Sequence, residues 1–521
     1  MKRQVISLIQ ICVGRYEIVL LLALVTVSAV ICLMRFNSIP VGAFFDDVHY
    51  IVLAESLSAG TGYRLVNMPG APVEDAFPPG WPLLLTPLVT LFPENYTVLK
   101  LLSLLFWLAS IPLMYWLFKT RLQPIYTLAI VALAAVNPSL VGMTGTVMSE
   151  AAYIFFSLMT LVLFEWWQQQ ERNQSVGLLI LIGLTVFYTV MVRTIGISLL
   201  GALLLYLMFK YRRFAISMVG LLLLVLGPIA WFNYQNGGVL IFSPLYYEHL
   251  IYVGANLAEY AQFWKYGSFI SVEVASGALI PVLGTNFVSK MTTSGLNYGL
   301  GVALLACTIW GYFVSLRRFK VMDLYVTLYF GILYLWVVYT SGTSHQTRLV
   351  IPMIPFLYFY LVQATSWGMN RFGASFPNYK SVVVVGLTCL IMLISLAFNY
   401  YELTSTIDNR VVTPSVGNLW LRQNTPPEAI VLSFDGISDY LYSHRRTKYF
   451  GPGITDLEQH VADNNIDYIL IQPRLLEWGK GEQYDNYVTS TLLPYLISHP
   501  TKFKLVYENS VHHVMIFQVI A

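Results

Sequence analysis

Residues 176–209 read VGLLILIGLTVFYTVMVRTIGISLLGALLLYLMF, an apolar run that contains a single charged residue. As one helix it would be about 51 Å long at 1.5 Å per residue, which is too long for a hydrocarbon core of about 30 Å. Basic residues flank both ends, with Arg172 before the run and Arg212 after it, so both ends belong on the same side of a membrane. We therefore predict two short crossings that turn at residues 193–196.

The composition of the whole chain agrees with this interpretation. Of its 521 residues, 57% are hydrophobic and 11% are charged, and the mean hydropathy is +0.64. A soluble domain carries about 25% charged residues, so this chain is expected in a membrane. The formal net charge of +3 is too small to indicate a nucleic-acid partner. The four cysteines are scattered through apolar segments, which excludes a zinc cluster and gives no sign of a disulfide framework.

Nine further apolar segments have the length of about 17–22 residues that crosses a hydrocarbon core. They lie at about 18–34, 97–118, 124–142, 150–167, 214–233, 294–315, 322–340, 349–367 and 381–399. The first of them lacks a small-residue cleavage site, so we predict that it is a retained helix. Together with the two halves of residues 176–209, they predict an α-helical polytopic membrane protein with about eleven transmembrane helices.

The positions of the basic residues predict the orientation. An N-terminus in the cytoplasm places 14 of the 21 lysines and arginines before residue 400 in short cytoplasmic loops, as the positive-inside rule requires. Residues 1–400 then form a transmembrane catalytic domain, with external loops at about 35–96 and 234–293. Residues 401–521 lie outside the cytoplasm.

Residues 401–521 differ in character from the rest of the chain. Ala429–Leu432 and Tyr468–Ile471 are short apolar runs, and polar helical stretches alternate with them. Short apolar runs bounded by polar segments are typical of strands. This part is therefore predicted to be a small extracytoplasmic α/β domain.

Ionisable residues gather at the predicted external boundary of the membrane. Asp46–Asp47, Glu150, Arg193 and Arg348 are far apart in sequence, yet the predicted topology places all of them at this boundary. Charged residues at membrane depth are energetically costly and usually serve a function. Acidic residues and two arginines in one plane predict a single site.

The acidic pair Asp46–Asp47 follows the first predicted crossing and begins an amphipathic, interfacial helix that extends to Ala59. A carboxylate in this position can remove a proton from an attacking hydroxyl group. Asp46 could also be the N-cap of this helix, and the two roles are compatible. His49 and Tyr50 follow in the same segment, and we expect them to contact the substrate.

Glu150 begins a predicted crossing, where it could serve as a cap because acidic residues suit helix N-termini. Arg193 and Arg348 could instead extend toward the membrane interface. However, arginine is a good phosphate ligand because its planar fork binds oxygens bidentately. A phosphate leaving group at the membrane surface needs such donors. His345, beside Arg348, would add a contact or remain solvated.

Two acids near a Pro-Pro turn, Glu74 and Asp75, are candidate ligands for a divalent cation. Two carboxylates without further ligands do not define a metal centre, so no cofactor is firmly predicted. The sequence leaves metal dependence open.

Four short motifs resemble those of bacterial GT-C membrane glycosyltransferases. They are Asp46-Asp47-x-x-Tyr50, Pro78-Pro79-Gly80-x-Pro82, Ser149-Glu150 and Arg348-x-x-x-Pro352-x-x-Pro355. Their order and shared side are similar to those of the protein O-mannosyltransferase and lipid A aminoarabinose transferase group. The resemblance covers residues 1 to about 400, and the C-terminal part resembles the variable periplasmic domain of such enzymes.

The resemblance implies an inverting transfer of a single sugar from a polyprenyl-phosphate donor to an acceptor hydroxyl on a lipid, a glycan or a protein. It implies that Asp46 is the catalytic base, that Asp47 is the second acid of the pair, and that Arg348 lies near the donor phosphate. The expected location is the inner membrane of a bacterial cell envelope, with the active site facing the periplasm. In one departure, Phe77 stands where many relatives have a basic residue before the Pro-Pro pair.

Two other classes of protein remain open. A transporter or flippase of lipid-linked glycans would show paired inverted repeats and polar residues at the midplane, whereas the predicted midplane here is nearly free of charge. An oligosaccharide polymerase or ligase would share the orientation, and the length of the transferred glycan would separate it from a monosaccharide transferase.

Overall fold

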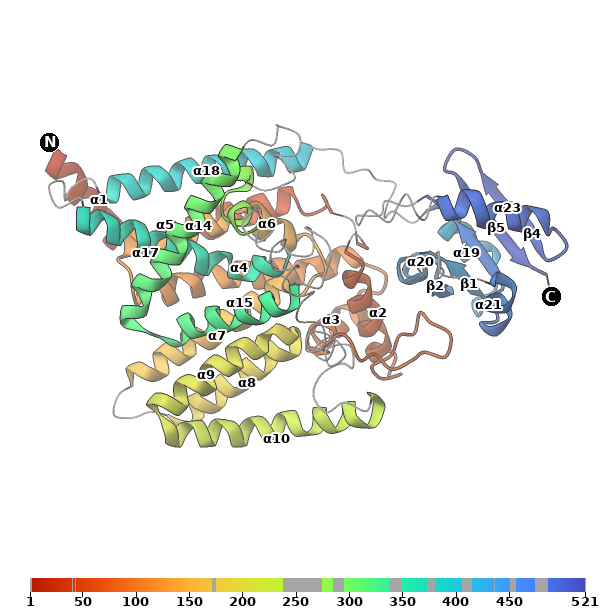
Figure 1. The fold of residues 1–521 in the computed structure, drawn as a ribbon, viewed down its shortest axis with the longest axis horizontal. Helices are drawn as coiled ribbons and strands as arrows, with labels where there is room; N and C mark the ends of the chain where they lie inside the picture. The colour runs from red at the N-terminus through yellow and green to blue at the C-terminus, as the bar shows by residue number, and fades with distance from the viewer. Residues whose placement is uncertain are drawn as a thin grey trace. The chain divides into compact units, whose positions relative to one another are not determined.

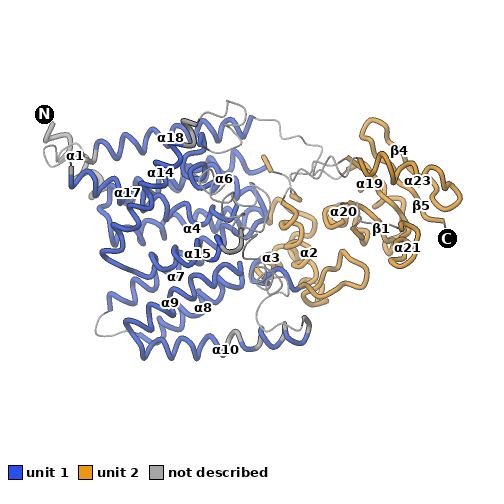
Figure 2. The backbone as a smooth tube through the Cα atoms, viewed as in Figure 1, with its two compact units in different colours: residues 1–37, 75–81, 100–405 blue, residues 38–74, 82–99, 406–521 orange. Residues whose placement is uncertain are grey.

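The structure is a computed structural model. It describes residues 2–39, 41–42, 44–170, 175–237, 274–283, 295–337, 348–372, 380–404, 415–434, 436–449, 456–473 and 486–520. The chain forms two compact units, drawn in Figure 2. The first, the helical unit, consists of residues 1–37, 75–81 and 100–405, and the second, the mixed unit, consists of residues 38–74, 82–99 and 406–521.

The helices of the transmembrane part coincide with the predicted apolar segments. They are α1 (Lys2–Met34), α4 (Tyr96–Lys119), α5 (Pro124–Ala135), α6 (Pro138–Thr144), α7 (Glu150–Gln169), α8 (Val176–Val192), α9 (Ile197–Lys210), α10 (Arg212–Gly237), α14 (Gly295–Ser315), α15 (Val321–Val337), α17 (Ile354–Phe372) and α18 (Lys380–Thr404) (Figure 1). Apart from a break at residues 136–137, each predicted segment is therefore helical over its described residues.

Six helices are long and apolar enough to cross a membrane: Tyr16–Met34, Tyr96–Lys119, Glu150–Gln169, Gly299–Arg318, Arg348–Arg371 and Val382–Thr404. The bent pair α5–α6 makes a seventh if it is counted as one span. The chain is therefore a polytopic integral membrane protein. Within the described residues α8, α9 and α15 are apolar but shorter, so the full count of eleven crossings stays a prediction.

The segment at 124–142 is not the single helix predicted, because it bends by 56° between α5 and α6. The side chain of Asn137 caps α6 by accepting hydrogen bonds from the N–H groups of Ser139 and Leu140 at 3.0 and 3.2 Å. Pro138 suits the first helical position, where a missing N–H needs no partner. The Asn-Pro pair therefore ends one helix and starts the next.

The predicted turn within residues 176–209 is confirmed. Helix α8 is followed by a 3₁₀ turn over Thr194–Gly196 (η1) and then by α9. The two helices lie side by side (Figure 1). Only glycine fits at position 196, because a Cβ there would lie 2.8 Å from the carbonyl carbon of Thr189.

The helix predicted to begin at Asp46–Asp47 is present in the mixed unit as α2 (Asp46–Ser58). Its buried residues occupy most of its circumference and include Val48, Ile51 and Leu53. The protein itself therefore covers most of α2, and the expectation of an amphipathic helix is wrong. The segment predicted as a loop at about 35–96 also contains an apolar helix that the sequence analysis does not predict, α3 (Gly80–Leu91).

The C-terminal part of the mixed unit contains the predicted sheet. Its strands are β1 (Ile430–Ser433), β2 (Arg446–Tyr449), β3 (Tyr468–Ile471), β4 (Phe503–Asn509) and β5 (Val514–Val519), in the order β2-β1-β3-β5-β4. β1 pairs in parallel with β2 and β3, whereas β5 pairs antiparallel with β3 and β4. The apolar runs recognised in the sequence are the neighbouring parallel strands β1 and β3. The helices of this part are α19 (Val416–Asn424), α20 (Gly436–Ser443), α21 (Leu457–Asp463) and α23 (Leu493–Ser498).

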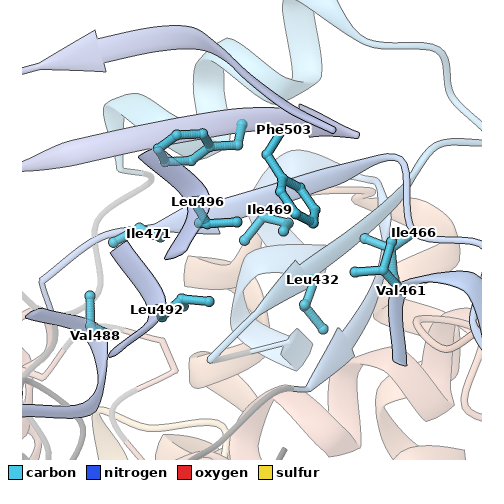
Figure 3. Packing of buried hydrophobic residues seen from close by; sticks show 10 residues of the cluster. Leu432, Val461, Ile466, Ile469, Ile471, Val488, Leu492, Leu496 and Phe503 are labelled. Carbon is cyan, nitrogen blue, oxygen red and sulfur yellow. The ribbon is translucent and has the colours of Figure 1, made fainter. Parts of the chain in front are cut away.

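Apolar clusters cover both faces of the sheet. Successive side chains of a strand point to opposite sides, so neighbouring residues belong to different clusters. Leu432 and Ile469 belong to one apolar cluster, which also contains Leu496 of α23 (Figure 3). Their chain neighbours Val431 and Leu470 belong to a second cluster, together with Leu421 of α19. Continuous apolar strands are expected when both faces are buried.

Candidate active site

Three predicted site residues from different elements meet in the helical unit. The Oε1 atom of Glu150, the first residue of α7, lies 2.6 Å from Nη1 of Arg193 and 3.2 Å from Nε of Arg348. Arg193 follows α8, and Arg348 precedes the 3₁₀ turn η4 (Ile351–Met353) and α17. The Glu150 side chain is fully buried, and the two arginine side chains are 13% and 12% exposed.

This charged cluster, defined as Glu150, Arg193 and Arg348, contains two positive charges and one negative charge. Taking ions out of water costs several kcal/mol each, and pairing offsets part of that cost. The Oε2 atom of Glu150 is buried and has no hydrogen-bond partner among the described residues. Guanidinium groups are good ligands for anions such as phosphate, and Oε2 can accept a hydrogen bond from a hydroxyl group.

The contacts of these residues bear on the alternative roles that the sequence leaves open. Ser149 occupies the N-cap position of α7, and its Oγ accepts a hydrogen bond from Nη1 of Arg193 at 3.3 Å. Glu150 is the first residue of the helix, where an acidic side chain is favourable. Arg193 and Arg348 are mostly buried and paired with Glu150, so neither extends into solvent.

The Pro78-Pro79-Gly80-Trp81 element supports the cluster from one side. A Cβ on Gly80 would lie 2.5 Å from the carbonyl carbon of Met191, near the end of α8, so glycine is required there. The hydroxyl of Tyr188 donates to the carbonyl oxygen of Gly80 at 2.8 Å. Trp81 donates from Nε1 to the carbonyl oxygen of Val147 at 3.0 Å. The element thus contacts the backbone just before both Arg193 and Glu150.

Buried tyrosines support the cluster at Arg348. The hydroxyl of Tyr329, on α15, donates to the carbonyl oxygen of Leu349 at 2.7 Å and so fixes the backbone next to Arg348. The ring of Tyr329 lies 6.0 Å from that of Tyr325 and 6.4 Å from that of Tyr153. Sequence reasoning missed these residues. The available signal was the four-residue spacing of Tyr325 and Tyr329, which places both on one face of a helix.

In the mixed unit, the acidic pair follows a strained turn. Phe45 has φ 61° and ψ −49°, a sparsely populated region for a residue other than glycine. The N–H of Asp46 donates to the carbonyl oxygen of Phe44 across it, which makes a γ-turn of the rare, positive-φ kind. Such strain persists only where the surroundings impose it, and it concentrates at functional sites. Phe45 is the N-cap of α2, so the alternative that Asp46 caps this helix is wrong.

The two acids of the pair have different environments. Asp47 is fully buried, and its Oδ2 and Oδ1 accept hydrogen bonds from the N–H groups of Gly42 and Val48 at 2.7 and 3.0 Å. Gly42 has φ 99°, which favours glycine. Asp46 is only partly buried. Asp47 therefore fixes the turn, and Asp46 is the more accessible carboxylate.

The comparisons with known proteins agree with this architecture. The family model of the dolichyl-phosphate-mannose-protein mannosyltransferases matches residues 85–252. The structure of ArnT from Cupriavidus metallidurans bound to undecaprenyl phosphate is similar over 98% of both chains, with 14% identity and a TM-score of 0.58. The oligosaccharyltransferase of Archaeoglobus fulgidus, in its complex with zinc and sulfate, is similar over 94% of this chain and 72% of its own, with 14% identity and a TM-score of 0.59. No curated protein matches the chain by sequence.

At this level of identity the structural matches establish the fold, and the family model independently points to sugar transfer. Residues 85–252 thus match a mannosyltransferase family model, and the chain shares its fold with ArnT and the oligosaccharyltransferase. The charged cluster lies in the helical unit and the acidic pair in the mixed unit. That the two groups form one site stays a prediction.

The other predicted substrate contacts lie on α2 or outside the described residues. The Nδ1 atom of His49 lies 3.2 Å from the carbonyl oxygen of Phe45, and the two rings are 5.0 Å apart. Burial lowers the pKa of His49, which favours the neutral imidazole at pH 7. Tyr50 is buried. His345 lies outside the described residues.

The two carboxylates predicted as cation ligands differ in exposure. Glu74 is buried, whereas Asp75 is exposed. In the described part of the chain, no group of three or more His, Cys, Asp or Glu side chains is placed to hold a metal ion. The divalent cation stays an expectation from the sequence.

Proposed function

We propose that this protein is a GT-C glycosyltransferase that transfers a single sugar from a polyprenyl-phosphate donor to an acceptor hydroxyl, with inversion at the anomeric carbon. The observation that carries the proposal is the buried Glu150–Arg193–Arg348 cluster, which has the charge and the donor groups to bind a phosphate. The similar ArnT structure contains undecaprenyl phosphate, and the matching family model is named for dolichyl-phosphate-mannose. Both compounds join a phosphate to a polyprenyl chain.

The arginines of the cluster are assigned to the leaving group. As the bond between the anomeric carbon and the phosphate oxygen breaks, negative charge increases on the departing polyprenyl phosphate. Guanidinium groups that are already in place stabilise this charge without rearrangement. Glu150 holds both Arg193 and Arg348 and so maintains that arrangement. Its Oε2 is assigned to a hydroxyl group of the donor sugar.

Asp46 is assigned as the general base. The acceptor oxygen forms the new bond to the anomeric carbon, and the Asp46 carboxylate takes the proton that this oxygen loses. Asp47 is committed to the backbone N–H groups of Gly42 and Val48, so it holds the turn. No acid is needed for the leaving group, because a phosphate departs as an anion.

The reaction is assigned to the extracytoplasmic face of a bacterial inner membrane. The supporting argument is the distribution of basic residues, which favours eleven crossings from a cytoplasmic N-terminus. The acceptor is a lipid, a glycan or a protein that carries a free hydroxyl group on that face.

The test is transfer by the purified chain in liposomes that contain radiolabelled undecaprenyl-phosphate sugars, one sugar at a time, with an extract of membrane and envelope acceptors. The expected result is loss of label from one donor and a product that gains one sugar. Movement of intact labelled donor between leaflets without its cleavage would indicate a flippase. Transfer only of preassembled oligosaccharides would indicate a polymerase or ligase.

A further inference from the structure

We propose that Tyr442, in the C-terminal part of the mixed unit, is a positioning residue for the turn that carries Asp46 and Asp47. The inference rests on the proposed role of Asp46 as the base. Tyr442 lies on α20, and its hydroxyl donates to the carbonyl oxygen of Val41 at 3.0 Å. This hydrogen bond joins two residues that are more than 400 positions apart in sequence, and it lies close to the acidic pair in the chain.

A single peptide group lies between Tyr442 and Asp47. The carbonyl of Val41 and the N–H of Gly42 belong to the same planar peptide unit. Tyr442 binds its oxygen, and Oδ2 of Asp47 accepts its N–H at 2.7 Å. Hydrogen bonds at both ends fix the orientation of the plane and polarise one another in this partly buried environment. The position of the Asp47 carboxylate is therefore coupled to the Tyr442 hydroxyl.

The backbone of this segment needs such a restraint. Gly42 and Phe45 both have positive φ, at 99° and 61°. A non-glycine residue in such a conformation costs about 1–3 kcal/mol and persists only when the surrounding structure imposes it. Asp47 restrains the segment from within, and Tyr442 restrains it from the C-terminal part of the chain.

Helix α20 is itself held in place, so Tyr442 is a fixed donor. The hydroxyl of Tyr96 donates to the carbonyl oxygen of Leu441 at 3.1 Å, and the rings of Tyr96 and Tyr442 meet edge-on at 6.2 Å. The N–H of Thr447, on β2, donates to the carbonyl oxygen of Asn67 at 2.7 Å. These contacts join the sheet part to the first external loop within the mixed unit.

The hydroxyl of Tyr442 remains a hydrogen-bond donor over the neutral and mildly alkaline pH range. Burial and the charge of Asp47 raise the pKa of Tyr442, so the phenol keeps its proton at neutral and mildly alkaline pH. The carbonyl oxygen of Val41 can only accept, so the direction of this hydrogen bond is fixed.

The test compares Tyr442→Phe with Tyr440→Phe in the full-length enzyme. Both variants remove one hydroxyl from α20, but the Tyr440 hydroxyl makes no hydrogen bond within the described part of the chain. Two quantities are measured: hydrogen–deuterium exchange of residues 41–47, and kcat for sugar transfer at saturating donor. Each is also measured for Tyr442→Phe in the Asp46→Asn background.

Tyr442→Phe is expected to speed exchange of the Gly42 amide and to lower kcat by about 3- to 10-fold, as loss of one hydrogen bond implies. Tyr440→Phe should change neither. In the Asp46→Asn background Tyr442→Phe should cause no further loss of kcat, because its effect acts through the base.

Three results would overturn the positioning role: unchanged exchange in Tyr442→Phe, equal loss of kcat in both phenylalanine variants, or the same loss with and without Asp46. Wild-type turnover in Asp46→Asn, by contrast, would overturn the proposed base. The exchange measurement does not depend on sugar transfer, so the two failures are distinguishable.

Discussion

Gly80 packs against Met191 so closely that a Cβ on the glycine would lie 2.5 Å from the carbonyl carbon of Met191. Met191 is two residues before Arg193, so this contact determines where the end of α8 places one arginine of the charged cluster. The Pro-Pro-Gly element therefore has a structural reason to contain glycine, and the reason lies next to the candidate phosphate site.

We predict that Gly80→Ala weakens donor binding. The added methyl group would meet backbone, which cannot move aside as a flexible side chain does, and overpacking of this kind costs about 1–3 kcal/mol. Displacement of Arg193 should lower donor affinity by about tenfold or more, which titration with undecaprenyl phosphate would measure. Gly220→Ala in α10 is the matched control, since nothing lies within 4 Å of its Cβ position. Equal affinities in Gly80→Ala and Gly220→Ala would refute the supporting role of the element.

A second prediction concerns Arg348. Arg348→Ala should weaken donor binding by about 10- to 100-fold, because a charged hydrogen bond contributes about 1.5–3 kcal/mol. Arg348→Lys should recover only part of the affinity, since lysine lacks the planar fork. Arg121→Lys is the control, because Arg121 makes a similarly buried pair with Asp323 at 3.0 Å elsewhere in the helical unit. Donor affinity that is unaffected in Arg348→Ala would leave the cluster with a structural role only.

The orientation can be tested by itself. Eleven crossings from a cytoplasmic N-terminus place residue 521 outside the cytoplasm. An alkaline phosphatase fused after this residue should therefore be active, and a green fluorescent protein fused at the same point should not fluoresce. The opposite pattern would reverse the topology and, with it, the membrane face assigned to the reaction.

A fourth prediction concerns the stability of the C-terminal domain against pH. Burial raises the pKa of Asp439 to about 6, although Asn418 and Gln472 donate to its Oδ1 at 3.0 and 2.7 Å. A carboxyl whose pKa is higher in the folded state stabilises the fold below about pH 4. This stabilisation, about 3 kcal/mol in full, is lost as the pH rises through 6.

Asp439→Asn removes this titration while keeping the shape of the side chain. In scanning calorimetry the variant should lose the part of the stability difference between pH 4 and pH 7 that Asp439 supplies. The exposed Asp463→Asn on α21 is the control for removing one carboxylate from the domain. An unchanged pH dependence in Asp439→Asn would show that this carboxyl does not titrate as described.

Much of the fold could be predicted because a hydrocarbon core imposes a length. The run at 176–209 is too long for one crossing and has basic residues at both ends, and these two facts place its turn at the residues where η1 lies. The apolar strands β1 and β3 could also be predicted from the sequence, since both are buried on two faces and bounded by polar residues.

Features that depend on local polar contacts could not be predicted in the same way. Hydropathy averaged over a segment does not reveal the effect of Asn137 and Pro138, although this pair breaks the helix. The two acids at 46 and 47 are equivalent in sequence, and only the γ-turn at Phe45 makes one of them buried and the other accessible. Tyr329, which binds the backbone next to Arg348, lies on a different helix. Its role therefore could not be predicted without knowledge of the fold.

The proposed reaction requires that Asp46 takes a proton from the acceptor during sugar transfer. The most direct test is the single-turnover rate of label transfer from a polyprenyl-phosphate sugar by Asp46→Asn, with donor binding measured on the same preparation. The amide is nearly isosteric with the carboxylate, so folding and donor binding should persist. A positioned base contributes about 10²–10⁴-fold, and the rate should fall by about this factor. A wild-type rate in Asp46→Asn, together with loss of transfer in Asp47→Asn, would contradict the account.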